Sequence, residues 1–205
     1  IYTEEELQKF RDGSDPYGYP NTDWNKEVLL PRAWQQMHSL TASGGSDKVK
    51  YFAGFGYVKQ DALYGDTRTN KSTSGFNRYN ARVNIDANIV DKYLNLSADM
   101  AYRQEDRNSI AGSTSDVFNN MHRNPQTDPG RFPDGNLGKV SLGVNPIGLA
   151  TEGGWVKDRK SVLNTRFMLD FNVPGLEGLN LKGIFSYDKI FNSIKRWTTP
   201  VDFYV

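Results

Sequence analysis

The sequence lacks cysteine and has only two histidines among its 205 residues. Disulfide bonds, thiol chemistry and a zinc site built from cysteine and histidine are therefore excluded. Its 25 basic and 24 acidic side chains nearly cancel, which argues against nucleic acid or an anionic membrane surface as the main partner. No apolar run approaches about 18 residues, so no transmembrane helix is predicted. A signal peptide is not expected either, because the start lacks a charged segment followed by an apolar one.

What the sequence does contain is a long alternation of polar and apolar residues. Between Arg78 and Ile89 the even positions are polar and the odd positions are apolar. Since side chains alternate between the two faces of a strand, this run predicts a strand with one apolar face. After a short turn at Asp91 and Lys92, a second run continues the pattern to Glu105. The two runs are expected to pair as an antiparallel hairpin.

The length of these runs points to a membrane. Strands in soluble proteins usually hold about 5 or 6 residues, whereas this alternation continues for about a dozen. At about 3.4 Å per residue and a tilt of about 40°, the segment from Tyr79 to Ile89 rises about 25 Å, the height of the lipid-facing band of an outer-membrane barrel. A basic residue at the lipid midplane costs about 2 to 4 kcal/mol. The strand face that carries the polar residues would therefore point into the lumen of the barrel. The lumen-facing charges would be Arg78, Arg82, Asp86, Asp99, Arg103, Glu105, Arg166, Asp170, Lys182 and Asp188.

Four further runs predict strands, at residues 36–43, 48–60, 163–172 and 179–191. The connections along the chain alternate between short and long. Up-and-down membrane barrels place short turns in the periplasm and long loops outside the cell. The predicted organisation is an extracellular loop at 1–35, hairpins at 36–60, 76–105 and 162–191, and a long extracellular loop at 106–161. Since closure needs about eight strands, we expect an all-β fold of antiparallel up-and-down strands that forms part of a large transmembrane β-barrel.

Two short helices are expected in the long loops. Thr3 and Glu6 have the spacing of a capping box at the start of a helix over Glu4 to Arg11, which Asp12-Gly13 ends. A second helix is expected near residues 115–123. The residues after 191 are expected to begin a further strand.

Several segments carry a family resemblance over nearly the whole chain. They are Tyr19-Pro20-Asn21-Thr22-Asp23-Trp24, Leu40-Thr41-Ala42-Ser43-Gly44-Gly45-Ser46-Asp47-Lys48-Val49-Lys50-Tyr51-Phe52, Gly56-Tyr57-Val58-Lys59-Gln60, Arg78-Tyr79-Asn80-Ala81-Arg82-Val83-Asn84-Ile85-Asp86, Asn145-Pro146 and Pro174-Gly175-Leu176-Glu177-Gly178-Leu179. In this order they resemble the SusC/RagA-like TonB-dependent transporters of the Bacteroidetes outer membrane. The Ser-Gly-Gly stretch that leads into Tyr51-Phe52 is quite specific.

The resemblance implies an outer-membrane barrel of about 22 strands, surrounded by membrane lipid, with an N-terminal plug domain. It implies a SusD-like surface lipoprotein as a partner and the import of oligosaccharides, or in some members peptides. Energy would come from TonB through a motif that precedes this sequence. The chain would then be a mature or truncated piece that holds early barrel strands and extracellular loops, without the plug.

The extracellular loops are where such a protein would hold a substrate, by aromatic stacking and hydrogen bonds. Trp24, Phe132 and Trp155 are the candidate substrate-binding residues, and packing within their own loops is the alternative. Gly54 and Gly56 fall on the lumen-facing parity, where a missing side chain would let the plug approach closely. A local bend or bulge would explain these glycines equally well.

No catalytic residue, metal site or cofactor is predicted. His38 falls on the apolar parity of a strand and His122 in a loop helix, about 80 residues apart and without a nearby nucleophile pattern. The leading hypothesis is therefore a barrel segment of an importer. The alternative is a secreted soluble β-sandwich that binds carbohydrate or acts as an adhesin.

Overall fold

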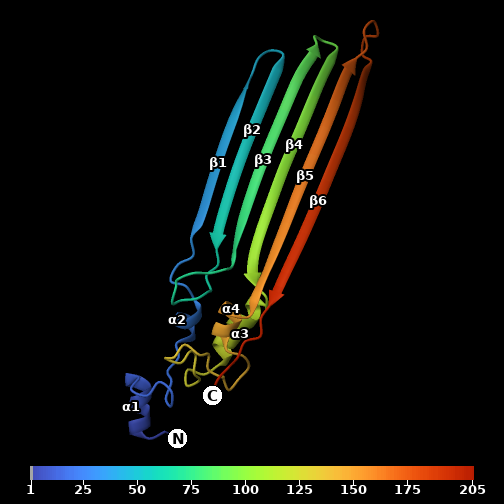
Figure 1. The fold of residues 1–205 in the computed structure, drawn as a ribbon. Helices are drawn as coiled ribbons and strands as arrows, with labels where there is room; N and C mark the ends of the chain where they lie inside the picture. Colours follow the sequence, from blue (N-terminus) through green and yellow to red (C-terminus); the bar gives the residue numbers. More distant parts are fainter. Residues whose placement is uncertain (1) are drawn as a thin grey trace.

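The computed structural model describes residues 2–205, and its main element is one six-stranded antiparallel sheet (Figure 1). The strands lie side by side in the order of the sequence. They are β1 (Gln35–Gly45), β2 (Val49–Asp61), β3 (Gly75–Val90), β4 (Leu94–Ile110), β5 (Gly154–Asn172) and β6 (Asn180–Thr198). The predicted all-β, antiparallel, up-and-down arrangement is confirmed.

The strands reach further toward the long connections than the alternation predicts. β4 continues to Ile110 and β5 begins at Gly154, so the connection between them holds residues 111–153 instead of the expected 106–161. In these extensions charged residues occupy both parities, for example Asp106 and Arg107, while the antiparallel pairing continues. The backbone hydrogen bonding between the strands therefore extends beyond the residues that show the alternating pattern.

Short turns and long connections lie at opposite ends of the sheet, as Figure 1 shows. The turns hold residues 46–48, 91–93 and 173–179, and the connections hold residues 62–74 and 111–153. In the tightest turn Lys92 takes a left-handed backbone conformation, with φ at 69°. The predicted rhythm of short and long connections is thus present in the structure.

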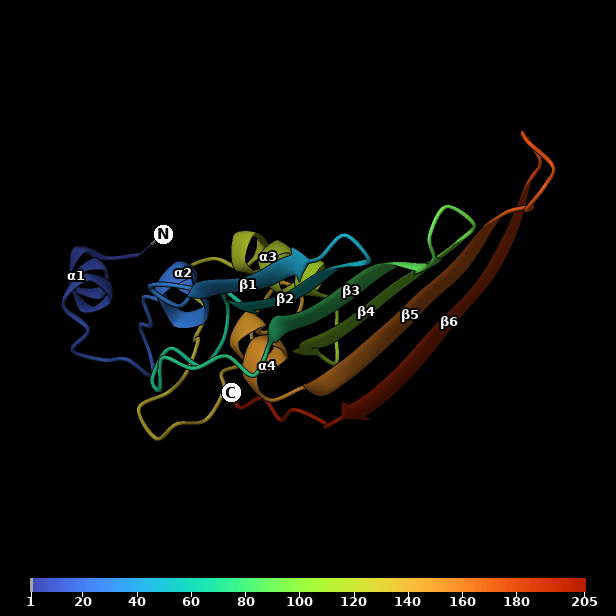
Figure 2. The same ribbon diagram turned by 90° about the horizontal axis from the view of Figure 1, so that it is seen from above.

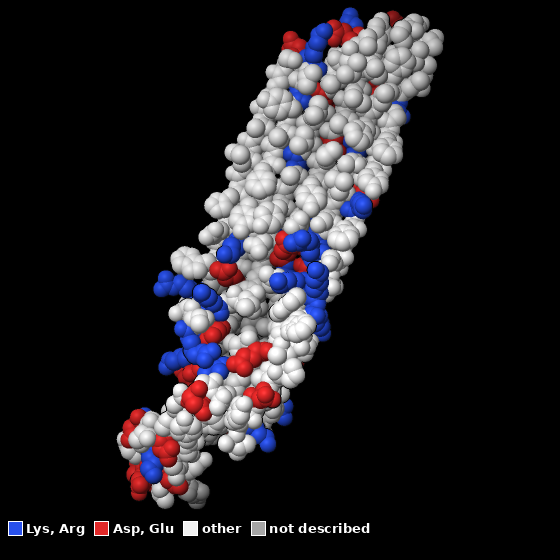
Figure 3. Space-filling view, in the orientation of Figure 1, with Lys and Arg blue, Asp and Glu red and all other residues white. Residues whose placement is uncertain are grey.

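One face of the sheet is apolar over most of its length, and we call it the apolar face. Its band consists of His38, Leu40 and Ala42 on β1, Val49, Tyr51, Ala53, Phe55 and Tyr57 on β2, Tyr79, Ala81, Val83, Ile85 and Ala87 on β3, Leu94, Leu96, Ala98, Met100, Tyr102 and Gln104 on β4, Ser161, Leu163, Thr165, Phe167, Leu169 and Phe171 on β5, and Leu181, Gly183, Phe185, Tyr187, Lys189 and Phe191 on β6. Lys189 is its one charged side chain among the described residues. Figure 3 shows a long stretch of sheet surface with few charges, between a small group of charges at the turn end and a larger one toward the helices.

The opposite face, which we call the polar face, carries all ten charges that the alternation assigned to it. Several of them form ion pairs between neighbouring positions, such as Lys182 with Asp170 at 3.4 Å and Arg103 with Glu105 at 3.5 Å. The alternation is less regular on β6, where Ile184, Ile190 and Ile194 share the polar face and are 61–66% exposed.

Neither face of the sheet is covered by a second sheet in residues 2–205. Figure 2 shows that successive strands form a curved, twisted wall with β1 at one edge and β6 at the other. A sandwich needs two sheets packed about 10 Å apart, and residues 2–205 form one sheet.

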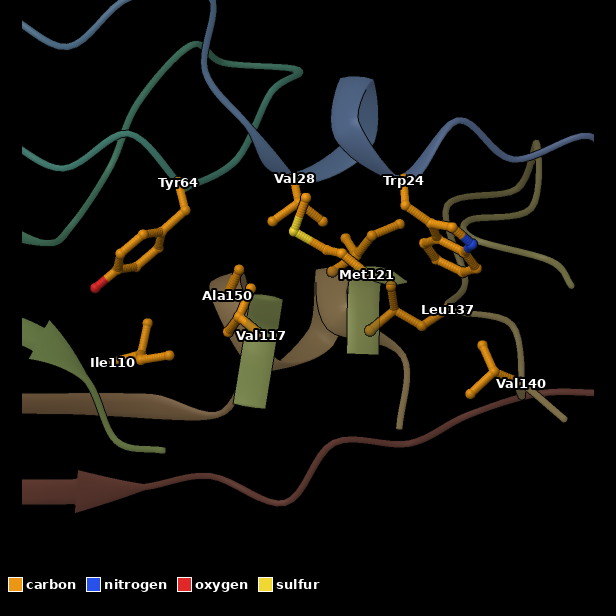
Figure 4. Close-up of a cluster of buried hydrophobic side chains, with 10 residues drawn as sticks. Trp24, Val28, Tyr64, Ile110, Val117, Met121, Leu137, Val140 and Ala150 are labelled. Carbon is orange, nitrogen blue, oxygen red and sulfur yellow. The ribbon is translucent and has the colours of Figure 1, made fainter. Parts of the chain in front are cut away.

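The buried core lies at one end of this wall, in a region that we call the cap and that holds residues 14–34, 62–74, 111–153 and 199–205. It contains α2 (Trp24–Val28), α3 (Thr114–Arg123) and α4 (Pro146–Thr151). The core side chains are Trp24, Val28, Tyr64, Ile110, Val117, Met121, Leu137, Val140, Ile147 and Ala150 (Figure 4). The predicted helix near 115–123 is confirmed, whereas α2 and α4 were not predicted.

The C-terminal residues return to the cap and do not start a new strand. Val201 and Phe203 pack against the core, and Tyr204 forms an isolated bridge with Gly138. The expectation of a further strand after residue 191 is wrong, because β6 itself continues to Thr198 and the chain then folds back.

The first helix, α1 (Glu4–Asp12), projects away from the cap (Figure 2). Its predicted capping box is present, since the Thr3 side chain accepts from the Glu6 amide and the Glu6 carboxylate accepts from the Thr3 amide at 2.7 Å. Gly13 ends the helix in a left-handed conformation. Among residues 2–205, none of the helices combines the length and the apolar character needed to cross a membrane.

Candidate functional site

Trp24 lies inside the cap core rather than on a ligand-facing surface. Its side chain is 4% exposed, and its indole nitrogen donates a hydrogen bond to the Pro125 carbonyl at 3.1 Å. Asp23 caps the short helix that Trp24 begins. Trp24 therefore joins two distant loops, and its ring has no free face on which a ligand could stack.

Phe132 is half-buried and stacks on Tyr17, with ring centroids 5.3 Å apart and planes 12° from parallel. Tyr17 is 56% exposed and comes from a segment more than a hundred residues earlier in the sequence. We call these two rings the stacked pair. Parallel aromatic rings at the outer surface of a loop can stack on a sugar ring or on another aromatic group. Tyr17 was not among the predicted ligand residues, although Tyr17, Tyr19 and Trp24 lie close together in the sequence.

Trp155 lies on a strand and not in a loop, contrary to the expected loop boundary at 161. It is paired across the ladder with Ile110 on one side and Trp197 on the other, on the apolar face. The Lys157 amino group lies 4.6 Å from the centre of its ring. Trp155 thus lies on the apolar face three rows beyond Ser161, where the apolar band of β5 begins.

Gly54 and Gly56 lie on the polar face of β2, as the alternation predicts. The ladder passes through both glycines without a register shift, so neither marks a bulge. A Cβ atom at Gly56 would lie 2.9 Å from the amide nitrogen of Asn80. The space above Gly56 is thus partly filled by a neighbouring side chain.

The middle of the polar face is hollowed around Ala101, a small residue among long ones. A recess of about 320 Å³ lies here, between Arg82, Asn164 and Arg166. The Asp99 carboxylate forms an ion pair with the Arg166 guanidinium, 3.8 Å away, and accepts a hydrogen bond from the Asn84 side chain. Asn164 donates to Asp188 at 2.8 Å. These groups pair with one another across the strands, as expected for charges on a lumen-facing wall.

Two buried polar side chains fix the loops of the cap. The Asn145 amide group donates to the Gly130 and Gly138 carbonyls at 2.7 and 2.8 Å, and its oxygen accepts from the Ile147 amide. The Thr22 hydroxyl donates to the Asp128 carbonyl at 2.7 Å. Both are at most 8% exposed, so they organise the loop backbone and do not contact solvent or ligand.

Ion pairs also stabilise individual loops of the cap. The Arg68 side chain donates to Asp66 and lowers the pKa of that carboxyl. The side chain of Lys26, and then its backbone amide, lower the pKa of Asp23 in the same way. These are local contacts within single turns and form no shared site.

The histidines and the carboxylates do not assemble into a catalytic or metal-binding group. His122 bonds through its ring to the Phe118 carbonyl at 2.7 Å, within its own helix. His38 stacks on Tyr57, with ring centroids 6.2 Å apart. Across residues 2–205 no three histidine, aspartate or glutamate side chains are placed to hold a metal ion.

The geometry thus defines a curved wall with one apolar and one polar face, covered at one end by a cap. Neither a protein-family model nor a curated protein sequence matches the chain. A chain in the structure of the RagAB peptide importer in the "open-open" state has a similar fold, with a TM-score of 0.66 and 17% identity. The similarity covers 98% of this chain and 24% of that chain.

A chain in the structure of the RagAB peptide transporter is similar as well, with a TM-score of 0.63 and 16% identity over 93% of this chain and 22% of that one. The present chain therefore spans less than a quarter of the length of the chains that it matches. At this level of identity the similarity concerns the fold alone.

Proposed function

We propose that this chain is a stretch of wall, with its external loops, of a TonB-dependent importer in a bacterial outer membrane. The observation that carries the proposal is the apolar face, where large side chains such as Leu40, Phe185 and Met100 are 49–72% exposed. Soluble monomers rarely expose contiguous apolar patches larger than a few hundred Å². Lipid is the medium in which such a face is stable.

The height of the apolar band supports this proposal. On β5 it runs from Ser161 to Phe171, and at about 3.4 Å per residue with a tilt of about 40° this corresponds to about 25 Å. Tyr57, Tyr79 and Phe191 lie in one row at its cap-side border. Bands of this height with aromatic residues at their borders characterise outer-membrane barrels.

The connections give the wall an orientation. Barrels of this kind have short periplasmic turns and long extracellular loops, so the turn end would face the periplasm and the cap would face the outside. β1 and β6 would continue the ladder with strands from other parts of the protein. Closing the barrel would pair both edges, which removes the exposed backbone groups that an open sheet presents.

The polar face would line the lumen, opposite a plug domain. Its ion-paired charges suit a wet or protein-filled interior, and the exposed Ile184, Ile190 and Ile194 offer apolar contacts to a packed plug. Gly54 and Gly56 are the proposed points of closest approach on β2. TonB would act through a part of the protein outside this sequence.

We further propose a SusD-like surface lipoprotein as the partner that covers the cap, and oligosaccharides or peptides as the substrates. The resemblance in the sequence favours oligosaccharides. The likeness in fold to a peptide importer favours peptides. Of the three aromatic candidates, Phe132 with Tyr17 is the pair placed to stack on either class.

Cysteine labelling tests the orientation, because this sequence has no cysteine of its own. Asn136→Cys in the cap and Ser46→Cys in a turn would be introduced separately into the complete protein in intact cells. A membrane-impermeant maleimide should label the first position and reach the second only after the outer membrane is permeabilised. Equal labelling at both positions in intact cells would contradict the proposed orientation.

Substitution of the stacked pair tests the binding surface. Phe132→Ala should weaken substrate binding by about three- to tenfold, the range expected for one lost stacking contact. Leu142→Ala, at a residue 47% exposed in the same connection, is the matched control and should leave binding unchanged. Binding of the complete protein to oligosaccharide and peptide pools would be compared, and an effect in neither pool would remove Phe132 from the site.

A further inference from the structure

Four basic side chains lie on β5 and β6 on both sides of the cap-side border of the apolar band. Lys189 is one row inside the border, Arg159 one row beyond it, and Lys157 and Lys195 two rows beyond it. We call Lys157, Arg159, Lys189 and Lys195 the basic cluster, and all four lie on the apolar face. Only Arg159 forms an ion pair, with Asp106 across the ladder. Within residues 2–205 no carboxylate lies within 4.0 Å of the other three amino groups. The cluster therefore carries uncompensated positive charge.

The placement of two of these lysines is unfavourable for the sheet alone. Lys157 and Lys195 are directly opposite each other on neighbouring strands. Like charges in this position repel, since opposing Cβ atoms are only about 5 Å apart. The Lys157 amino group lies over the Trp155 ring, and an anion bound beside the two lysines would reduce the repulsion.

A recess lies beside these lysines and connects the charges to the apolar band. Its volume is about 440 Å³, and three basic residues of its lining, Lys157, Arg159 and Lys195, outnumber the two acidic ones, Asp106 and Asp158. Asp106 is paired with Arg159, and the rest of the lining is Asn77, Asn108, Phe191 and Ser193. Phe191 belongs to the border row of the band, and Trp155 and Trp197 lie beyond the lysines. A ligand here would meet basic groups and hydrogen-bond donors at its polar end and aromatic surface at its apolar end.

The opposite border of the same band differs. At the turn end its last row is Leu94, Phe171 and Leu181, and the turns beyond this row carry charges of both signs, Asp47, Lys48, Asp91 and Lys92, in place of a basic cluster. A bilayer has two headgroup layers, and general solvation of a membrane protein would place charges at both borders alike. The one-sided cluster therefore fits a leaflet whose lipids are anionic.

We propose that the basic cluster binds the phosphate group of an anionic lipid in the leaflet on the cap side, with the lipid's acyl chains lying on the apolar band. This inference rests on the proposed function, because it requires the apolar face to be in a membrane. A lipid fits better than a partner protein, since the recess opens directly onto the band that acyl chains would cover. Lysine and arginine near a membrane surface each strengthen the attraction to acidic lipids.

The test uses the complete protein in detergent and a lipid that differs only in its phosphates. Diphosphoryl and monophosphoryl lipid A would be titrated separately, and bound lipid counted by native mass spectrometry. The unmodified protein should prefer the diphosphoryl form. The double substitution Lys157→Gln and Lys195→Gln should weaken binding of that form about tenfold, in line with the loss of basic contacts to a phosphate.

The control is Lys160→Gln with Arg196→Gln, which removes two positive charges from the same strands but on the polar face. It should leave lipid binding unchanged. Equal losses in both double variants, or none in the first, would overturn the inference. Flotation of the same samples with phosphatidylcholine vesicles separates the two failures: a protein that inserts but shows no phosphate preference refutes the lipid site, and one that does not insert refutes the proposed function as well.

Discussion

The cap and the sheet of this protein differ in how much of their apolar surface is buried. The cap buries Val28, Val117 and Leu137 to 2% exposure or less, as a soluble domain does. The sheet exposes nearly every large apolar side chain on one face, including Leu40 and Phe185 on its edge strands at more than 60%. Burial of apolar surface is the main favourable contribution to folding in water. The cap therefore has a hydrophobic core of its own, whereas the apolar face of the sheet has to be covered by other molecules.

The largest effect is expected in the cap core. Leu137→Ala would leave a cavity among Trp24, Ile147 and their neighbours and should destabilise the cap by about 2 to 5 kcal/mol. Hydrogen exchange of the 111–153 segment in the complete protein would report the loss. Leu142→Ala, at a side chain 47% exposed, should change the same measurement by less than about 0.5 kcal/mol. Similar costs for both would contradict the distinction between core and surface in the cap.

The apolar face should reject charge almost as strongly. Met100→Arg places a guanidinium near the middle of the band and should cost about 2 to 4 kcal/mol when the complete protein is unfolded from lipid vesicles. Ser97→Arg on the same strand points to the polar face near Asp86 and should be tolerated. If Ser97→Arg cost more free energy of unfolding than Met100→Arg, the polar face and not the apolar face would lie against lipid.

The hydrogen bonds of Asn145 should matter less than the apolar core. Asn145→Ala would remove the donor from the Gly130 and Gly138 carbonyls and should cost the cap about 1 to 3 kcal/mol. Asn136→Ala, at an exposed loop residue, serves as the comparison. Protease cleavage of the 130–138 loop should accelerate in the first variant alone.

The smallest effect is expected at α1, outside the cap core. Thr3→Ala removes the N-cap and should cost this helix about 1 kcal/mol. The hydrogen bonds from the backbone and side chain of Thr3 lower the pKa of Glu6, so their contribution is present above the ordinary glutamate pKa and is lost as the pH falls through the lowered value. Amide protection over residues 4–12, followed against pH, should drop there in the natural protein and drop by less in the variant, which loses the side-chain hydrogen bond but keeps the one from the backbone amide of residue 3.

The sheet could be predicted from the sequence because its information is local. A period of two assigns each side chain to a face, and Gly175 or Asp91 marks a turn without reference to distant residues. The ends of β4 and β5 were missed because charges at 106–107 and 157–160 interrupt the alternation while the ladder continues.

The cap could not be predicted in the same way. Its contacts join residues far apart in the sequence, such as Trp24 with Pro125 and Thr22 with Asp128. No periodic pattern in the sequence predicts such contacts. For the same reason Trp24 was selected as a ligand residue and Tyr17 was not. An aromatic residue in a loop looks the same in the sequence whether its side chain is exposed or buried. Only the fold distinguishes the two cases.

Spin labels along β5 test the central claim most directly. Single cysteines at residues 162–171 of the complete protein, labelled in lipid bilayers, would be measured for collision with oxygen, which partitions into lipid, and with a water-soluble nickel chelate. We predict high oxygen collision at the odd positions 163–171 and low oxygen collision at the even positions, in strict alternation. Equal access of the nickel chelate to both parities would show that both faces lie in water and would contradict the assignment of this wall to a membrane.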